Sequence, residues 1–220
     1  MNYDAIFDAK PRCLWEDSYL LERLCAIKVK SKMSVLDIAS GTGRLMTPFG
    51  RDFVALDKDV DMLALNPAKY KRQGNYETLK LFQGEEFDLL TFLFGVIKDQ
   101  DEFQMILNQS HRLLKHGGKF FGVVLSKGRL DSFIHPELYK WGDFQTFSKD
   151  EITGMVAKAG LTQRFDRTVG MTASVFDVAE KILSARQLDG FIRWYMKRQA
   201  GDLDVPFLRW HYVVFEAFKR

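Results

Sequence analysis

The chain has 220 residues, a net charge of +3 and 46% hydrophobic residues, the composition of one ordinary globular domain. Its longest nearly uncharged apolar run, Leu89 to Ile97, is too short for a membrane-spanning helix. The N-terminus lacks the pattern of a signal peptide, and the two cysteines, Cys13 and Cys25, have neither the spacing nor the partners of a zinc site. We therefore expect a cytoplasmic protein with no membrane partner and no bound metal.

The basic residues occur in small groups, such as residues 28–32 and 69–72, and acidic residues are interleaved nearly everywhere else. The small positive balance therefore favours a solvated basic face over a nucleic-acid groove. The sequence leaves the oligomeric state open.

The first half of the chain alternates helical and extended patterns. Apolar residues at helical spacing predict a helix from Cys13 to Lys28. We then expect a strand at about 34–38, a helix from about residue 43, a strand at about 53–56, a helix capped by Asp59 that stops before Pro67, and a short strand at about 70–72. Pro48 is tolerable only near the start of the second of these helices.

The second half continues the alternation and then breaks it. Residues 87–92 and 119–125 are nearly continuous apolar runs, typical of strands covered on both faces, and a helix at 101–114 separates them. Two further strands are expected at 161–167 and 210–218, with a long helical region at about 174–199 between them. The pattern predicts an α/β fold with a doubly wound, mostly parallel sheet and helices on both faces.

A glycine-rich turn follows the first strand, and an acid follows the second. Residues 34–44 read Ser-Val-Leu-Asp-Ile-Ala-Ser-Gly-Thr-Gly-Arg, and Asp57 lies 14 residues beyond Gly43. Glycine lets main-chain N–H groups approach a ligand closely, because it has no Cβ. An acid at the end of the neighbouring strand can accept hydrogen bonds from ribose hydroxyls. Together they predict a site for an adenosine-containing cofactor.

Two cofactors compete for this site. A dinucleotide site requires a third glycine three residues after the second, where this chain has Met46. Asp37 also lies where a pyrophosphate would approach, and a carboxylate repels phosphate but attracts an amino group and a sulfonium. S-adenosylmethionine carries both positive groups, so we predict S-adenosylmethionine rather than NAD.

The segment Asp37-x-Ala39-x-Gly41-x-Gly43 resembles motif I of the class I S-adenosylmethionine-dependent methyltransferases, and Asp57 resembles their motif II acid. Residues 59–63 resemble the helix opening that follows it, and residues 73–79 resemble the segment near the adenine, with Asn75 in place of Asp. The resemblance implies a Rossmann-like seven-stranded sheet with an antiparallel last strand. The cofactor-binding residues that it implies are Asp37, Ala39, Ser40, Gly41, Gly43, Arg44, Asp57, Lys58, Met62, Asn75, Tyr76, Phe92 and Phe94.

The resemblance extends from about residue 33 to about residue 165. Residues 86–95 resemble the family's fourth strand, residues 112–119 its turn into strand five, and residues 144–161 the helix before strand six. We therefore expect a single domain, 1–220, with an N-terminal helical lid at 1–32 and a cofactor-binding core at 33–125. Residues 126–147 and 174–200 are extra to this core and are expected as acceptor-side insertions.

Methyl transfer from a sulfonium needs an aligned nucleophile and exclusion of water more than it needs a base. His135 is the candidate base, with an ordinary surface histidine as the alternative. Aromatic residues outside the core fold can hold a cationic group. The candidate acceptor-pocket residues are Tyr3, Trp15, Tyr139, Trp141 and Trp194.

We therefore expect a methyltransferase that acts on N or O of a small molecule and releases S-adenosylhomocysteine. A methyltransferase acting on RNA or protein is the first alternative. The segment Thr91-Phe92-Leu93-Phe94-Gly95 lacks the N/D-P-P-Y/F motif of enzymes that methylate exocyclic base amines. A non-catalytic cofactor-binding subunit is the second alternative, and a nicotinamide-dependent oxidoreductase comes last.

Overall fold

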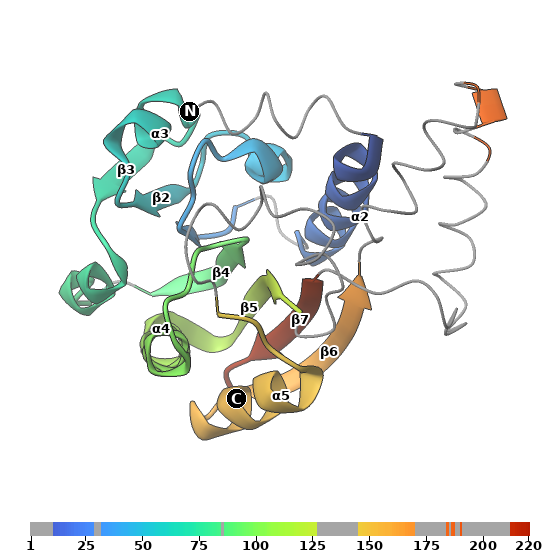
Figure 1. The fold of residues 1–220 in the computed structure, drawn as a ribbon. Coiled ribbons are helices and arrows are strands. Elements are labelled where there is room, and N and C mark those ends of the chain that lie inside the picture. Colours follow the sequence, from blue (N-terminus) through green and yellow to red (C-terminus); the bar gives the residue numbers. More distant parts are fainter. Residues whose placement is uncertain are drawn as a thin grey trace.

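The computed structural model describes residues 11–28, 32–84, 86–126, 145–169, 184, 186–187, 190 and 212–220, and of residues 11–16, 18 and 165–169 only the backbone. It contains a seven-stranded sheet in the order β3-β2-β1-β4-β5-β7-β6 (Figure 1). The pairs from β3 to β5 are parallel, and β7 runs antiparallel to both β5 and β6. The predicted doubly wound sheet and its antiparallel last strand are confirmed.

The strands are β1 (Val35–Ile38), β2 (Val54–Asp57), β3 (Tyr70–Gln73), β4 (Phe87–Leu93), β5 (Leu114–Leu125), β6 (Thr162–Val169) and β7 (Tyr212–Phe218). The helices are α2 (Pro11–Ile27), η1 (Arg44–Phe49), α3 (Val60–Leu65), η2 (Tyr76–Leu81), α4 (Gln100–Leu113) and α5 (Lys149–Lys158). None of the helices in these ranges is long and apolar enough to cross a membrane.

Two elements differ from the sequence-based expectation. The helix expected after Gly43 is a short 3-10 helix, η1, with Pro48 inside it. Proline has no N–H to donate within a helix, so a regular α-helix is not sustained there. Strand β5 begins at Leu114, before the expected residue 119, because backbone pairing with β4 already starts at Phe87. The long helical region expected at 174–199 lies almost entirely outside the described residues.

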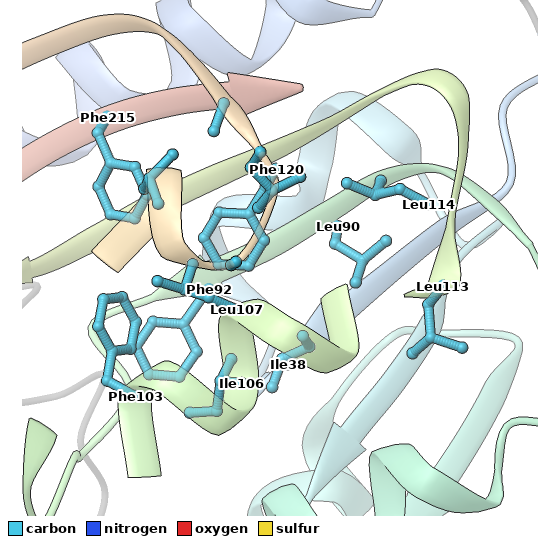
Figure 2. Close-up of a cluster of buried hydrophobic side chains, with 14 of the residues drawn as sticks. Ile38, Leu90, Phe92, Phe103, Ile106, Leu107, Leu113, Leu114, Phe120 and Phe215 are labelled. Atoms are coloured by element: carbon cyan, nitrogen blue, oxygen red, sulfur yellow. The ribbon is translucent and has the colours of Figure 1, made fainter. Parts of the chain in front are cut away.

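Two hydrophobic clusters cover the two faces of the sheet. One lies between the sheet and helices α4 and α5, where Phe103 of α4 packs against Phe92 (Figure 2). Phe103 also packs against Phe147. The other lies under α2, η1 and α3, and includes Leu24 and Phe121. Figure 1 shows α2 on one side of the sheet and α4 and α5 on the other. Alternate strand residues enter opposite clusters, which explains the continuous apolar runs in the sequence.

The chain leaves and re-enters the sheet twice at the same end of the sheet. Ser126, directly after β5, forms a bridge with Phe147, so the chain returns at residue 147 to the point where it left. At the same end of the sheet, Tyr212 at the start of β7 pairs with both Leu125 and Val169, the last residues of β5 and β6. On both occasions the chain therefore leaves and re-enters the sheet at the end where β5 and β6 finish.

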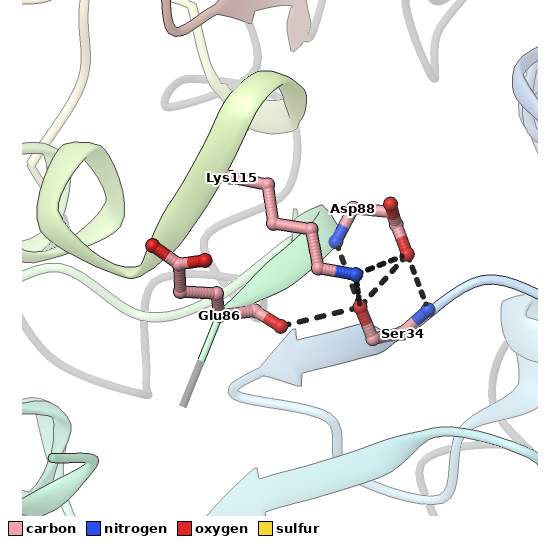
Figure 3. A network of polar contacts seen from close by, with 4 residues as sticks. All are labelled: Ser34, Glu86, Asp88 and Lys115. Atoms are coloured by element: carbon pink, nitrogen blue, oxygen red, sulfur yellow. Dashed lines mark hydrogen bonds and ion pairs between the residues drawn. The ribbon is translucent and has the colours of Figure 1, made fainter. Parts of the chain in front are cut away.

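A polar network joins the strands at the opposite end of the sheet, where β1, β4 and β5 begin (Figure 3). Asp88 accepts hydrogen bonds from the N–H and hydroxyl of Ser34, each at 2.8 Å, and from the ammonium of Lys115 at 3.0 Å. The hydroxyl of Ser34 also contacts the Glu86 carbonyl at 3.2 Å. The network joins the starts of three adjacent strands, β1, β4 and β5, far from their carboxyl ends.

Replacing Asp88 with Asn is expected to destabilise the fold by about 1 kcal/mol without changing ligand affinity. Burial opposes ionisation of Asp88, but the groups of Ser34 and the Lys115 ammonium outweigh it and lower its pKa to about 2. Its stabilising contribution is therefore complete above its ordinary pKa of 3.8 and is lost as the pH falls towards 2. Urea unfolding of both proteins between pH 2 and 7 measures the difference, which should shrink at the acid end. A constant difference would contradict this assignment.

Candidate cofactor site

The candidate site lies at the carboxyl ends of four adjacent parallel strands. The turns after β1, β2, β3 and β4 contain residues 39–43, 58–59, 74–75 and 94–99. Ligands of open α/β sheets bind outside this edge. The sheet order therefore brings together the glycine-rich turn, the second acid and the segment around Asn75, as the sequence predicted.

Asp57 ties the turn after β1 to the turn after β2. One of its carboxylate oxygens accepts the Gly41 N–H at 2.7 Å, and the other accepts the Asp59 N–H at 2.9 Å. Asp59 in turn caps α3 by accepting from the N–H groups of Asp61 and Met62. Each carboxylate oxygen keeps a second lone pair, so Asp57 can still accept hydrogen bonds from a ribose.

Asp37 lies beneath the turn and is only 2% exposed. Its oxygens accept hydrogen bonds from the hydroxyls of Ser40 and Thr91, both at 2.6 Å. The pKa of Asp37 is raised to about 6, because burial, with a smaller contribution from the negative charge of Asp57, outweighs the two hydroxyls, which lower it. Without a ligand, the negative charge at Asp37 is therefore costly, and a cationic ligand nearby would offset that cost.

Gly41 and Gly43 serve different purposes. Both have positive φ angles, 51° and 71°. A Cβ on Gly41 would meet no heavy atom within 4 Å, whereas a Cβ on Gly43 would come within 3.0 Å of the Asn66 side chain. Gly41 therefore borders the open space that a cofactor needs, and Gly43 allows the turn to pack against Asn66.

Gly43→Ala is expected to cost about 2 kcal/mol of stability, because it adds a close contact to an unfavourable φ angle. Gly41→Ala adds only the cost of the unfavourable φ angle, about 1 kcal/mol of stability. Its Cβ enters the open space, so it should reduce ligand affinity more than Gly43→Ala does. Gly84→Ala is the control, with φ of 70° and free space around its Cβ. Urea unfolding and ligand titration of the three variants check the order. Equal stability losses at Gly41 and Gly43 would contradict it.

Among the described residues, two residues other than glycine have positive φ, and both lie in turns at the carboxyl ends of the strands. Ala39 follows β1 with φ of 56°, and Phe94 follows β4 with φ of 61°. The two turns touch, since a Cβ on Gly95 would lie 3.0 Å from the Cβ of Ala39. Such backbone conformations cluster at functional sites, where the surroundings hold them in place.

Phe92 is packed in the hydrophobic core next to the site. Its ring is fully buried and packs against Tyr76 and Phe103, with ring centroids 5.9 and 5.7 Å away. Side chains alternate along β4, so Phe92 enters the cluster under α4. Phe92 is thus a core residue in this structure, and its contact with a cofactor stays a prediction. Phe94 is half-buried beyond the end of the strand and stays a candidate.

The segment after β3 places two candidates beside the site. Asn75 caps η2 by accepting the Glu77 N–H at 3.1 Å. The half-buried Tyr76 donates its hydroxyl hydrogen to the Val96 carbonyl at 2.5 Å and so links this turn to the loop after β4. The pKa of Tyr76 is raised, first by burial and then by the charges of Glu102 and Asp57, so the hydroxyl stays protonated.

The structure describes only part of the predicted acceptor side. Arg44 pairs with Asp17 of α2 and lies 6.0 Å from the ring of Phe94. Phe94 in turn meets the ring of Tyr212 edge-on, with centroids 4.6 Å apart. The predicted residues His135, Tyr3, Tyr139, Trp141 and Trp194, and the side chain of Trp15, lie outside the described residues.

The sequence pattern missed Asn66 and Thr91. Both are buried, and both contact the motif around Asp37 and Gly41. Asn66 ends a short helix before a proline, and Thr91 lies within an apolar strand. Neither position carries a pattern that distinguishes it from a structural residue.

The residues present fit S-adenosylmethionine. The open face at Gly41, the acceptor oxygens of Asp57 and the buried carboxylate of Asp37 match a ligand with ribose hydroxyls and positive charge. In the described part of the chain, no three His, Cys, Asp or Glu side chains lie together as a metal site.

Comparison with known families and proteins agrees with this fit. Residues 36–122 match the methyltransferase domain family. The ubiquinone/menaquinone biosynthesis C-methyltransferase UbiE of Zymomonas mobilis is 28% identical over 174 residues, 72% of this chain and 65% of that protein. The protein of the same name from Bradyrhizobium is 31% identical over 129 residues, 51% of this chain and 50% of that protein. This chain thus spans about half to two thirds of these curated relatives.

Solved structures share the fold. A methyltransferase of Archaeoglobus fulgidus that depends on S-adenosylmethionine superposes with a TM-score of 0.67 and 13% identity, covering 99% of this chain and 98% of that one. Geranyl diphosphate C-methyltransferase of Streptomyces coelicolor, bound to S-adenosylhomocysteine, superposes with a TM-score of 0.62 and 13% identity, covering 93% and 79%.

Proposed function

We propose that this chain, whose residues 36–122 match the methyltransferase domain family, transfers a methyl group from S-adenosylmethionine to a small-molecule acceptor. The proposal is supported chiefly by the position of the Asp57 carboxylate, which accepts the N–H groups of Gly41 and Asp59 beside the open space at Gly41. The buried charge at Asp37 adds an electrostatic reason for a cationic cofactor.

The cofactor supplies the reactive methyl group and a good leaving group, so the chain's residues bind, orient and exclude water. Asp57 would accept the ribose hydroxyls, and the turn at residues 39–43 would approach the cofactor through its backbone. Asn75 and Tyr76 would lie on the adenine side, with Lys58 and Met62 beside the ribose. Asn75 keeps a free lone pair on its side-chain oxygen for this purpose.

The acceptor would lie between Phe94 and the two insertions, 126–147 and 174–200. The chain enters the first insertion and returns from the second at the carboxyl end of β5. Both would then cover a reacting acceptor and keep water away. His135 is the proposed base for a hydroxyl or protonated amine acceptor, and the lid aromatics Tyr3 and Trp15 would close the other side.

Nitrogen or oxygen is the proposed methyl acceptor, and carbon is the second candidate. The carbon candidate rests on the curated relatives, which are named C-methyltransferases. A carbon acceptor needs an activated, electron-rich carbon, whereas an amine already has a lone pair. An RNA or protein acceptor is the alternative to a small-molecule acceptor. A non-catalytic cofactor-binding role is the alternative to catalysis.

Transfer from S-adenosylmethionine with a ¹³C-labelled methyl group tests the proposal. The protein is incubated with pools of small amines, phenols, carboxylates and quinols, and the chemical shift of the transferred methyl identifies the atom that received it. Transfer to an amine or hydroxyl supports the proposal, and transfer to carbon supports the second candidate. Cofactor binding with transfer to RNA or protein only, or to nothing, would favour the alternatives.

A further inference from the structure

We propose that Asn66 is a positioning residue for the cofactor, which orients the Ser40 hydroxyl towards Asp37 and fixes the Gly41 carbonyl. The inference rests on the proposed function, since the turn concerned is the one assigned to S-adenosylmethionine. Residue 66 lies outside the glycine-rich motif at residues 37–43 and is distinct from the acid, Asp57, that follows the motif.

The Asn66 side chain uses all its hydrogen-bonding groups within the turn region. It is 2% exposed, and its amide nitrogen donates to the Ser40 hydroxyl and to the Gly41 carbonyl, both at 2.8 Å. Its amide oxygen accepts the Ala68 N–H at 2.9 Å. Rotating the amide by 180° would bring two donors together at Ala68, so its orientation is fixed.

This orientation decides the direction of the next hydrogen bond. Because the Ser40 oxygen accepts from Asn66, its own hydrogen is free to point at Asp37, 2.6 Å away. The chain of donors therefore runs from Asn66 through Ser40 to the Asp37 carboxylate. Such a chain supports the ionised form of Asp37, the form that attracts a cationic ligand.

The second hydrogen bond of the amide holds the turn itself. Gly41 donates its N–H to Asp57 on one side and accepts from Asn66 through its carbonyl on the other. The peptide groups of this turn are thus anchored by one acid and one amide. Gly43 packs so closely on Asn66 that a Cβ there would come within 3.0 Å of it.

Asn66→Asp is the sharpest test. The carboxylate has the same shape and still accepts the Ala68 N–H, but it cannot donate to Ser40 or Gly41. We expect S-adenosylhomocysteine to bind about 10-fold more weakly, as for the loss of buried hydrogen bonds. In a Ser40→Ala background the same substitution should cost only about 3-fold, because the hydrogen bond to Ser40 is already missing and only the one to the Gly41 carbonyl is left to lose. Amide exchange of residues 40–43 in the ligand-free protein should also become faster.

The matched control is Asn108→Asp, the same chemical change at an exposed residue of α4 whose side-chain oxygen accepts from Gln104. It should leave affinity and turn exchange unchanged. If Asn66→Asp does not fold, Asn66→Ser, which is too short to reach both acceptors, takes its place. An affinity within 2-fold of the wild type, or an equal loss in the Ser40→Ala background, would overturn the inference. Failure of the wild type to bind would instead overturn the proposed function.

Discussion

Asp57→Asn is expected to weaken S-adenosylhomocysteine binding by about 100-fold. Both oxygens of Asp57 accept a backbone N–H, from Gly41 and from Asp59. An amide nitrogen at either position would face a donor, so the turn loses an anchor and a ribose hydroxyl loses an acceptor. Losing hydrogen bonds to a charged group costs about 2–3 kcal/mol, which corresponds to this change in affinity. Calorimetric titration measures it.

Asp61→Asn is the control for this substitution. It makes the same acid-to-amide change four residues away, on the exposed first turn of α3. We expect it to change affinity by less than about 3-fold, since it removes only a surface charge. If Asp57→Asn bound the ligand as well as Asp61→Asn does, Asp57 would have no role in the site.

Asp37→Asn is expected to stabilise the ligand-free protein by about 2–3 kcal/mol at pH 7.5. Burial raises the pKa of Asp37 from 3.8 to about 6, so ionisation in the folded state is costly. The native state then holds its proton more tightly than the unfolded state, and stability falls as the pH rises from about 4 to 6 and is constant above that. An Asn at this position can accept from Ser40 and donate to Thr91, because the threonine hydroxyl is free to turn.

The gain should depend on pH. At pH 4 the wild-type carboxyl is already protonated in the folded state, so the two proteins should differ by less than about 1 kcal/mol. Urea unfolding of both proteins from pH 4 to 8 gives the difference directly. A loss of stability in Asp37→Asn at pH 7.5 would show that the ionised carboxylate is supported better than its burial suggests.

The same variant should bind S-adenosylhomocysteine about 10-fold more weakly at pH 7.5, since the ligand's ammonium loses its negative partner. In the wild type, affinity should increase from pH 5 to pH 7, as Asp37 ionises. In Asp37→Asn this increase should disappear. The acid would thus reduce the stability of the empty protein and favour the occupied one, a trade-off common at functional sites.

Local patterns in the sequence were enough to predict the sheet and the centre of the site. Asp37 lies near the end of one short strand, which Gly41 and Gly43 follow, and Asp57 ends the next strand. Parallel pairing places these residues at the same end of the sheet. The capping of α3 by Asp59 was also predicted, because an acid before a short apolar helix is a local signal.

The remaining features depend on contacts between distant segments. The pairing of Asn66 with Gly41 joins residues 25 positions apart, and no spacing rule indicates it. Phe92 was assigned to the site because the strand ends near it, but the pleat turns its ring into the core. Pro48 was recognised as a constraint, but the sequence pattern did not show that the helix around it would be the short 3-10 helix η1.

Calorimetric titration of the purified protein with S-adenosylhomocysteine, with NAD in a parallel experiment, tests the cofactor assignment most directly. We predict micromolar binding of S-adenosylhomocysteine, one molecule per chain, and no heat from NAD. Binding of NAD alone, or of neither ligand, would contradict the assignment of S-adenosylmethionine as the cofactor.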